Sequence, residues 1–139
     1  MNQQEIQLSR KLTNQLLHLA QLSPDTEICG LVSSQNGVPS ACYPVANVAE
    51  YSAQRFLLDA VEQIAALKTM RERGEQLFAI YHSHPTAPAI PSSTDLKLAT
   101  YPDALYLIIS LNTKGILEMR GFYIQQQSAQ EVVLVLSEN

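Results

Sequence analysis

A chain of 139 residues with 46% hydrophobic and 16% charged residues has the size and composition of one ordinary globular domain, not of a disordered protein. Its formal net charge of −4 and its scattered basic residues argue against a nucleic-acid partner, which would need a basic patch. No apolar run is long enough to span a membrane, and the first residues lack a signal-peptide pattern. We therefore expect a single cytoplasmic domain over residues 1–139, with Cys29 and Cys42 reduced and no membrane partner.

The first predicted element is an amphipathic helix that ends at Ser23-Pro24. Its apolar residues recur at helical spacing and form one face: Leu8, Leu12, Leu16 and Leu19. An apolar strand over 27–32 follows, and a turn at 35–37 connects it to a second strand over 38–48. This pattern predicts a β-hairpin.

A second helix is predicted after a short strand over 55–58. Asp59 is the expected N-cap of this helix and Gly74 is placed to end it. The residues expected on its buried side are apolar: Val61, Ile64, Ala65 and Leu67.

The segment 77–81 is continuously apolar, which is typical of a central strand buried on both faces, and it leads directly into His82. A short helix is predicted over 93–100, and a hairpin turn at 112–115. Three further strands complete the pattern: 104–111, 116–124 and 132–136. The order α-β-β-β-α-β-α-β-β-β predicts an α/β fold in which helices flank a mixed β-sheet.

The candidate functional site is the run His82-Ser83-His84-Pro85, which Ser92 and Asp95 follow. Because side chains alternate along a strand, His82 and His84 project from one face and can reach the same ion. Asp95 lies in the first turn of the next helix, so its carboxylate can turn back toward the histidines. Two imidazoles and a carboxylate leave a fourth position for water, as in catalytic zinc sites.

Each part of this pattern also has an ordinary structural explanation. Ser92 and Asp95 alone resemble a capping box at a helix start, and alternate histidines occur on many strands. The four fixed positions together are expected by chance about once in several thousand chains of this length. Their conjunction at the end of a buried strand therefore favours a metal site.

With Glu27 upstream, in the run Glu-Ile-Cys-Gly-Leu, the pattern resembles the JAMM (MPN-positive) metalloproteases over nearly the whole chain. The short connections around the motif are similar to those of minimal prokaryotic-type members. The resemblance implies an MPN-type, cytidine-deaminase-like fold and a zinc ion bound by His82, His84 and Asp95. It also implies that Glu27 is the general acid/base and that Ser92 stabilises the oxygen of the tetrahedral intermediate.

The expected activity is hydrolysis of an amide bond after the C-terminal Gly-Gly of a ubiquitin-like or sulfur-carrier protein, whose tail would lie extended along a sheet edge. Zinc-activated water would attack, with Glu27 as the base. The alternatives are a non-catalytic MPN scaffold that binds partners, and a zinc hydrolase of a small molecule such as a deaminase. The chain lacks the Pro-Cys-x-x-Cys ligand pair of zinc deaminases. For Cys29 a small core residue is favoured over a reactive thiol, and the sequence indicates no particular oligomeric state.

Overall fold

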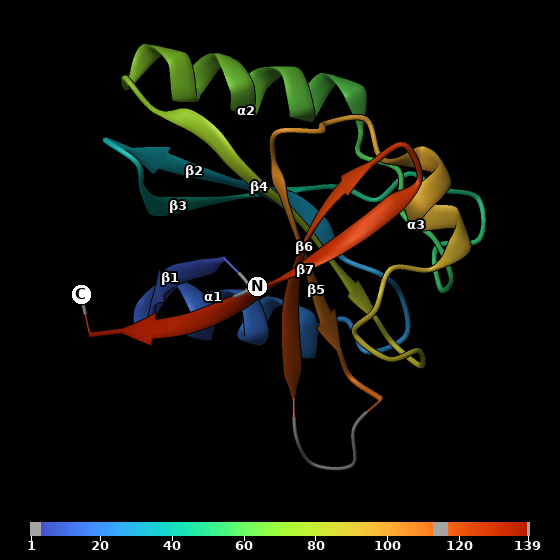
Figure 1. Cartoon of the computed structure of the whole chain (residues 1–139). Coiled ribbons are helices and arrows are strands. Elements are labelled where there is room, and N and C mark those ends of the chain that lie inside the picture. The colour runs from blue at the N-terminus through green and yellow to red at the C-terminus, as the bar shows by residue number, and fades with distance from the viewer. Residues whose placement is uncertain (1–3, 113–116, 139) are drawn as a thin grey trace.

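One mixed β-sheet of seven strands is the frame of the fold in the described residues, 4–112 and 117–138 of the computed structural model (Figure 1). The strands are β1 (Glu5–Ser9), β2 (Cys29–Gln35), β3 (Val38–Val45), β4 (Gln76–His84), β5 (Leu105–Ser110), β6 (Glu118–Gln125) and β7 (Ser128–Ser137). Their order across the sheet is β1-β7-β6-β5-β4-β2-β3. The pairs β1/β7 and β4/β5 are parallel and the others antiparallel, which confirms the predicted mixed α/β architecture.

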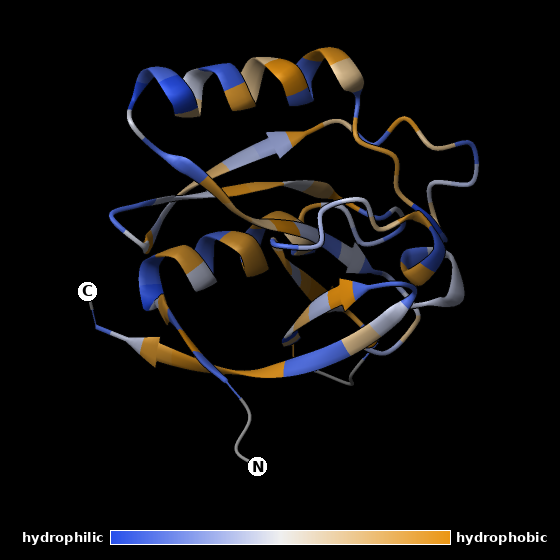
Figure 2. Ribbon diagram, turned by 45° about the horizontal axis from the view of Figure 1, so that its top comes forward, coloured by the Kyte–Doolittle hydropathy of each residue, from blue (hydrophilic) through white to orange (hydrophobic). Residues whose placement is uncertain are grey.

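Helices cover both faces of this sheet (Figures 1 and 2). They are α1 (Arg10–Gln21), α2 (Ala60–Glu72) and α3 (Ser93–Leu98). Leu16 of α1 packs in a core with Tyr81 of β4, whereas Met70 of α2 packs in a second core with Ile80, the preceding residue of β4. Both faces of β4 are therefore covered, as its continuous run of apolar residues predicted. None of the helices in the described ranges has the length and apolar character to cross a bilayer.

The start of the chain differs from the prediction, because Leu8 belongs to a strand and not to the first helix. β1 pairs in parallel with β7, and Leu8 lies opposite Leu136. Ser9 then caps α1, since its Oγ accepts a hydrogen bond of 3.0 Å from the backbone N–H of Leu12. Leu8 is buried in the same core as Leu12 and Leu16 of α1, so its apolar character continues the pattern of the helix although it lies in a strand.

The buried face of α2 also differs from the prediction. Val61 and Ile64, which were expected inside, are 77% and 67% exposed, and Ala65 is exposed as well. Only Leu67 of the predicted face packs against the core. The helix instead packs on the sheet through Ala66 and Met70. Apolar residues occur on both sides of α2, so helical periodicity alone favours neither face. The predicted ends of α2 are confirmed by the Asp59 cap and by the positive φ of Gly74.

The strand predicted over 55–58 is wrong. Only an isolated bridge between Asn47 and Leu58 forms there, within the loop of residues 46–59 that connects β3 to α2. Oδ1 of Asn47 accepts a hydrogen bond from the backbone N–H of Leu57. A strand would use this N–H to pair with a neighbouring strand. The other predicted elements are confirmed to within a few residues, among them the β2–β3 hairpin. The turn predicted at 112–115 lies, apart from Asn112, outside the described residues.

Candidate metal centre

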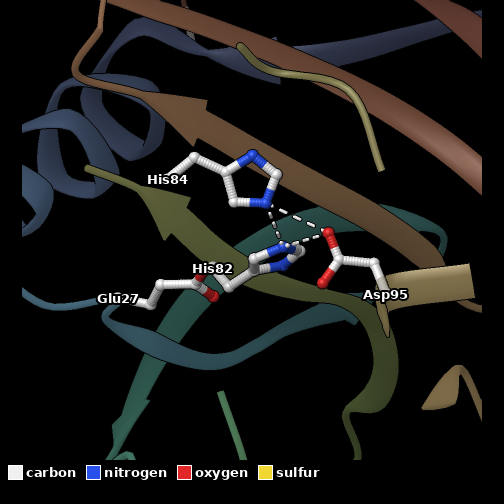
Figure 3. Close-up of side chains that lie close together, drawn as sticks. All are labelled: Glu27, His82, His84 and Asp95. Atoms are coloured by element: carbon white, nitrogen blue, oxygen red, sulfur yellow. Dashed lines mark hydrogen bonds and ion pairs between the residues drawn. The ribbon is translucent and has the colours of Figure 1, made fainter. Parts of the chain in front are cut away.

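Three buried side chains from β4 and α3 converge on one point (Figure 3). The Nε2 atoms of His82 and His84 are 3.2 Å apart, and each lies 3.0 Å from Oδ2 of Asp95. Both imidazoles therefore leave the same face of β4, as predicted, while the intervening Ser83 bonds to Ile28 of the neighbouring chain segment. Asp95 is brought to them by the loop that returns from β4 to α3.

Asp95 is fixed by the start of α3. Ser92 is the N-cap of this helix, and its Oγ accepts a 3.0 Å hydrogen bond from the backbone N–H of Asp95. In return, Oδ2 of Asp95 accepts a 2.9 Å hydrogen bond from the backbone N–H of Ser92. The two bonds complete a capping box, and the same Oδ2 atom also faces both imidazoles, so capping and metal binding are compatible at Asp95.

The tautomer of His84 follows from its second ring nitrogen. Nδ1 of His84 lies 2.7 Å from the carbonyl oxygen of Pro88, an acceptor that requires Nδ1 to carry the proton. The loop that presents this carbonyl is held by Ser110, whose Oγ donates a 2.7 Å hydrogen bond to the carbonyl oxygen of Ala87. In the neutral imidazole, Nε2 of His84 is therefore the nitrogen that can ligate a metal, at the point that it shares with Asp95 and His82.

The electrostatics of the three groups favour an ionised carboxylate. Burial opposes ionisation of Asp95, but hydrogen bonds from His82 and His84 outweigh it and hold the pKa of Asp95 well below its usual range. Burial lowers the pKa of His82. Burial also acts to lower the pKa of His84, yet its hydrogen bonds to Asp95 and to the Pro88 carbonyl raise it. The centre thus combines one anionic oxygen donor with two imidazole nitrogens.

These residues fit a zinc ion. Zinc bonds of roughly 2.0–2.1 Å in a tetrahedron place neighbouring donor atoms about 3.3 Å apart, close to the observed separations of 3.0–3.2 Å. The carboxylate of Glu27 lies in the same group, and the donor atoms of all four residues are within 4.8 Å of one another. The buried His82, His84 and Asp95 could therefore supply two nitrogens and one oxygen to a metal ion.

Glu27 lies beside this centre, two residues before the first residue of β2, so it does not begin the strand as predicted. Its side chain is buried, and Oε1 has no hydrogen-bond partner among the described residues. Burial raises the pKa of Glu27 to about 7, with smaller opposing effects of His84, which lowers it, and Asp95, which raises it. A carboxyl group with a pKa near neutrality can both take and return a proton.

Two residues next to the centre were not found from the sequence. The ring of Phe56 stacks on His82 with centroids 4.3 Å apart and an interplanar angle of 22°. Asn47 bonds to the backbone of Glu27. Both lie in the loop of residues 46–59, Asn47 at the end of the strand predicted over 38–48 and Phe56 in the strand predicted over 55–58, and no local spacing marks either one. Cys29 is buried near Glu27, and burial raises the pKa of its thiol to about 12, which agrees with a core residue.

A cavity of about 280 Å³ adjoins the centre, and His82 and Asp95 form part of its wall. The rest of the wall is mostly apolar and includes Phe56, Leu58 and Leu98. An extended chain that reached the centre from this side would therefore contact apolar surface.

Known proteins similar to this chain share one family. The family model of prokaryotic homologues of the JAB domain matches residues 9–122. The CysO-cysteine peptidase of Mycobacterium tuberculosis is 36% identical over 115 residues, which cover 81% of this chain and 78% of that protein. A probable TtuB-protein conjugate cleaving protease of Thermus thermophilus is 38% identical over 93 residues, 67% of this chain and 57% of that protein.

Solved structures show the same fold. A solution structure of a protein from Desulfitobacterium hafniense matches with a TM-score of 0.85 and 32% identity, covering 96% of this chain and 93% of that one. A JAB1/MPN domain protein from Archaeoglobus fulgidus matches with a TM-score of 0.55 and 20% identity, covering 96% of this chain and 98% of that one. The second likeness concerns the fold alone.

Proposed function

The chain belongs to the family of prokaryotic homologues of the JAB domain and is a hydrolytic enzyme of the JAMM type, and on this premise we propose a zinc-dependent peptidase or isopeptidase. Its substrate is the amide bond after the C-terminal Gly-Gly of a ubiquitin-like or sulfur-carrier protein. The convergence of His82, His84 and Asp95 at 3.0–3.2 Å beside Glu27 carries this proposal. The names of the two relatives, a CysO-cysteine peptidase and a protease that cleaves TtuB-protein conjugates, support the substrate class.

The positions of the side chains support the following proposed roles. His82, His84 and Asp95 would hold zinc, which when bound lowers the pKa of its water toward neutrality and polarises a carbonyl oxygen. Glu27 takes a proton from the attacking water and passes it to the leaving amine. Its burial supports this role, because a raised pKa lets the carboxyl group hold the proton between the two transfers.

Ser92 is proposed to stabilise the negative charge that develops on the carbonyl oxygen. Its Oγ accepts the backbone N–H of Asp95, which leaves the hydroxyl proton available for donation. One such donor contributes about 3 kcal/mol to the stability of a transition state.

The roles of Ser92 as cap and as donor can be separated by Ser92→Gly. Glycine at an N-cap costs only a few tenths of a kcal/mol relative to serine, whereas the loss of an oxyanion donor lowers kcat by about 10²–10³-fold. We expect the melting temperature to change little and kcat to fall by at least about 100-fold. The matched control is Ser9→Gly, which alters the cap of α1 and should leave kcat unchanged. A kcat of Ser92→Gly within twofold of the parent would contradict the role.

The substrate class is tested with a panel of fusions. Sulfur-carrier and ubiquitin-like proteins that end in Gly-Gly, each extended by a short C-terminal peptide, are incubated with the zinc-loaded protein and followed by intact-mass spectrometry. We expect release of the extension directly after Gly-Gly from at least one carrier, and no cleavage of unrelated peptides of the same length. Intact carrier fusions together with cleaved unrelated peptides would overturn the proposed substrate.

The two alternatives gain no support. A non-catalytic scaffold needs neither a buried acid with a raised pKa nor three converging metal donors. No observation favours a small-molecule substrate over a protein tail.

A further inference from the structure

The side chain of Asn47, in the loop between β3 and α2, uses every hydrogen-bonding position of its amide. Its Nδ2 donates to the carbonyl oxygens of Glu27 and Arg55, at 2.9 and 3.0 Å. Its Oδ1 accepts the backbone N–H groups of Ala49 and Leu57, both at 3.0 Å. One side chain therefore joins three separate stretches of backbone.

The first of these stretches carries Glu27. Because Glu27 lies outside β2, no strand pairing fixes it, and both of its backbone polar groups bond to the loop instead. Its N–H donates to the carbonyl oxygen of Ser52 at 2.7 Å, and its carbonyl oxygen accepts from Asn47. Oε1 of the Glu27 carboxylate has no partner in the described part of the chain. The position of this carboxylate therefore depends on how its backbone is held.

A second stretch, the segment 55–57, carries Phe56. Asn47 binds the carbonyl group of Arg55 and the N–H group of Leu57, the residues immediately before and after Phe56. The Phe56 ring stacks on the imidazole of His82 at 4.3 Å. The same amide thus connects the backbone of the proposed base with the backbone of the ring that covers a proposed ligand.

We infer that Asn47 is a positioning residue for the reaction, which sets the distance of the Glu27 carboxylate from the metal centre by fixing the Glu27 backbone against the 55–57 segment. The inference rests on the proposed function. Asn47 touches neither substrate nor metal in this role and acts through Glu27. A misplacement of about 1 Å at a catalytic group can cost about 100-fold in rate.

The variant that tests this inference is Asn47→Asp. The carboxylate keeps the acceptor toward Ala49 and Leu57, but it loses both donors and faces the carbonyl oxygens of Glu27 and Arg55 with a negative charge. We expect kcat to fall by about 10- to 100-fold with KM changed less than threefold and one zinc still bound per chain, because the three ligands come from β4 and α3. Gln125→Glu is the matched control, since it removes one amide bond to the carbonyl of Pro102, away from the centre.

The Glu27→Gln background separates positioning from a general loss of stability. If Asn47 acts through Glu27, the double variant Glu27→Gln/Asn47→Asp turns over no more slowly than Glu27→Gln alone. An additional tenfold loss in the double variant, loss of zinc, or a kcat of Asn47→Asp within twofold of the parent would each overturn the inference.

Should Asn47→Asp not fold, Asn47→Ser replaces it. Failure of both variants to fold would make Asn47 a stability residue and overturn the inference. A zinc-loaded parent that cleaves no carrier fusion contradicts the proposed function itself, whereas equal cleavage by parent and Asn47→Asp contradicts only this inference.

Discussion

The substitution Glu27→Gln is expected to lower kcat by about 10²–10⁴-fold, the range that general acid–base catalysis contributes, while zinc stays bound at one ion per chain. Glutamine keeps the shape of the buried side chain but cannot take a proton from water. The carboxylate is close to the ligands, yet Oε1 bonds to none of the described residues, so its removal leaves the hydrogen bonds among His82, His84 and Asp95 in place.

The measurement combines single-turnover cleavage of a carrier fusion with metal analysis of the same sample. Glu50→Gln, in which an exposed acid of the neighbouring loop is replaced, is the matched control and should behave as the parent. Full activity in Glu27→Gln would refute its role as the base. Loss of zinc from this variant would instead assign Glu27 to the ligands.

The substitution Asp95→Asn is expected to abolish stoichiometric zinc binding and, with it, turnover. It replaces the anionic oxygen that both imidazoles contact at 3.0 Å with a neutral amide, which is a poor zinc ligand. A ligand that binds only the folded state raises the free energy of unfolding by about 2.7 kcal/mol at 100 times its Kd. The parent should therefore show a zinc-dependent rise in melting temperature that Asp95→Asn lacks.

Asp59→Asn is the control for this experiment, because Asp59 also caps a helix and asparagine caps as well as aspartate. It should retain both the zinc-dependent thermal shift and the activity. A thermal shift in Asp95→Asn equal to that of the parent would show that zinc binds elsewhere.

The convergence of the three proposed ligands could be predicted because it depends on local geometry. Alternation along β4 places His82 and His84 on one face, and the third position of α3 turns Asp95 back toward the strand. Both features follow from short-range rules that hold in any surrounding fold. Glu27, by contrast, was identified through a resemblance to a family, since its distance from the histidines along the chain carries no geometric information.

The predictions that were wrong concern features that tertiary contacts determine. The hydrophobic pattern of α2 allows two buried faces, and contact with the sheet selects the one with Ala66 and Met70 and exposes Val61 and Ile64. The loop that follows β3 contains enough apolar residues to suggest a strand, but the Asn47 side chain bonds to the Arg55 carbonyl and the Leu57 N–H, two groups that a strand would use for pairing. No periodicity reports such a bond, so Asn47 could be found only in three dimensions.

The most direct test of a zinc-dependent hydrolase at this centre is the intact mass of a carrier fusion incubated with the metal-stripped protein, before and after addition of one equivalent of zinc. The account predicts an unchanged fusion mass without zinc, and a product that ends at Gly-Gly once zinc is added. Cleavage at an equal rate by the metal-stripped protein in the presence of a chelator would contradict it.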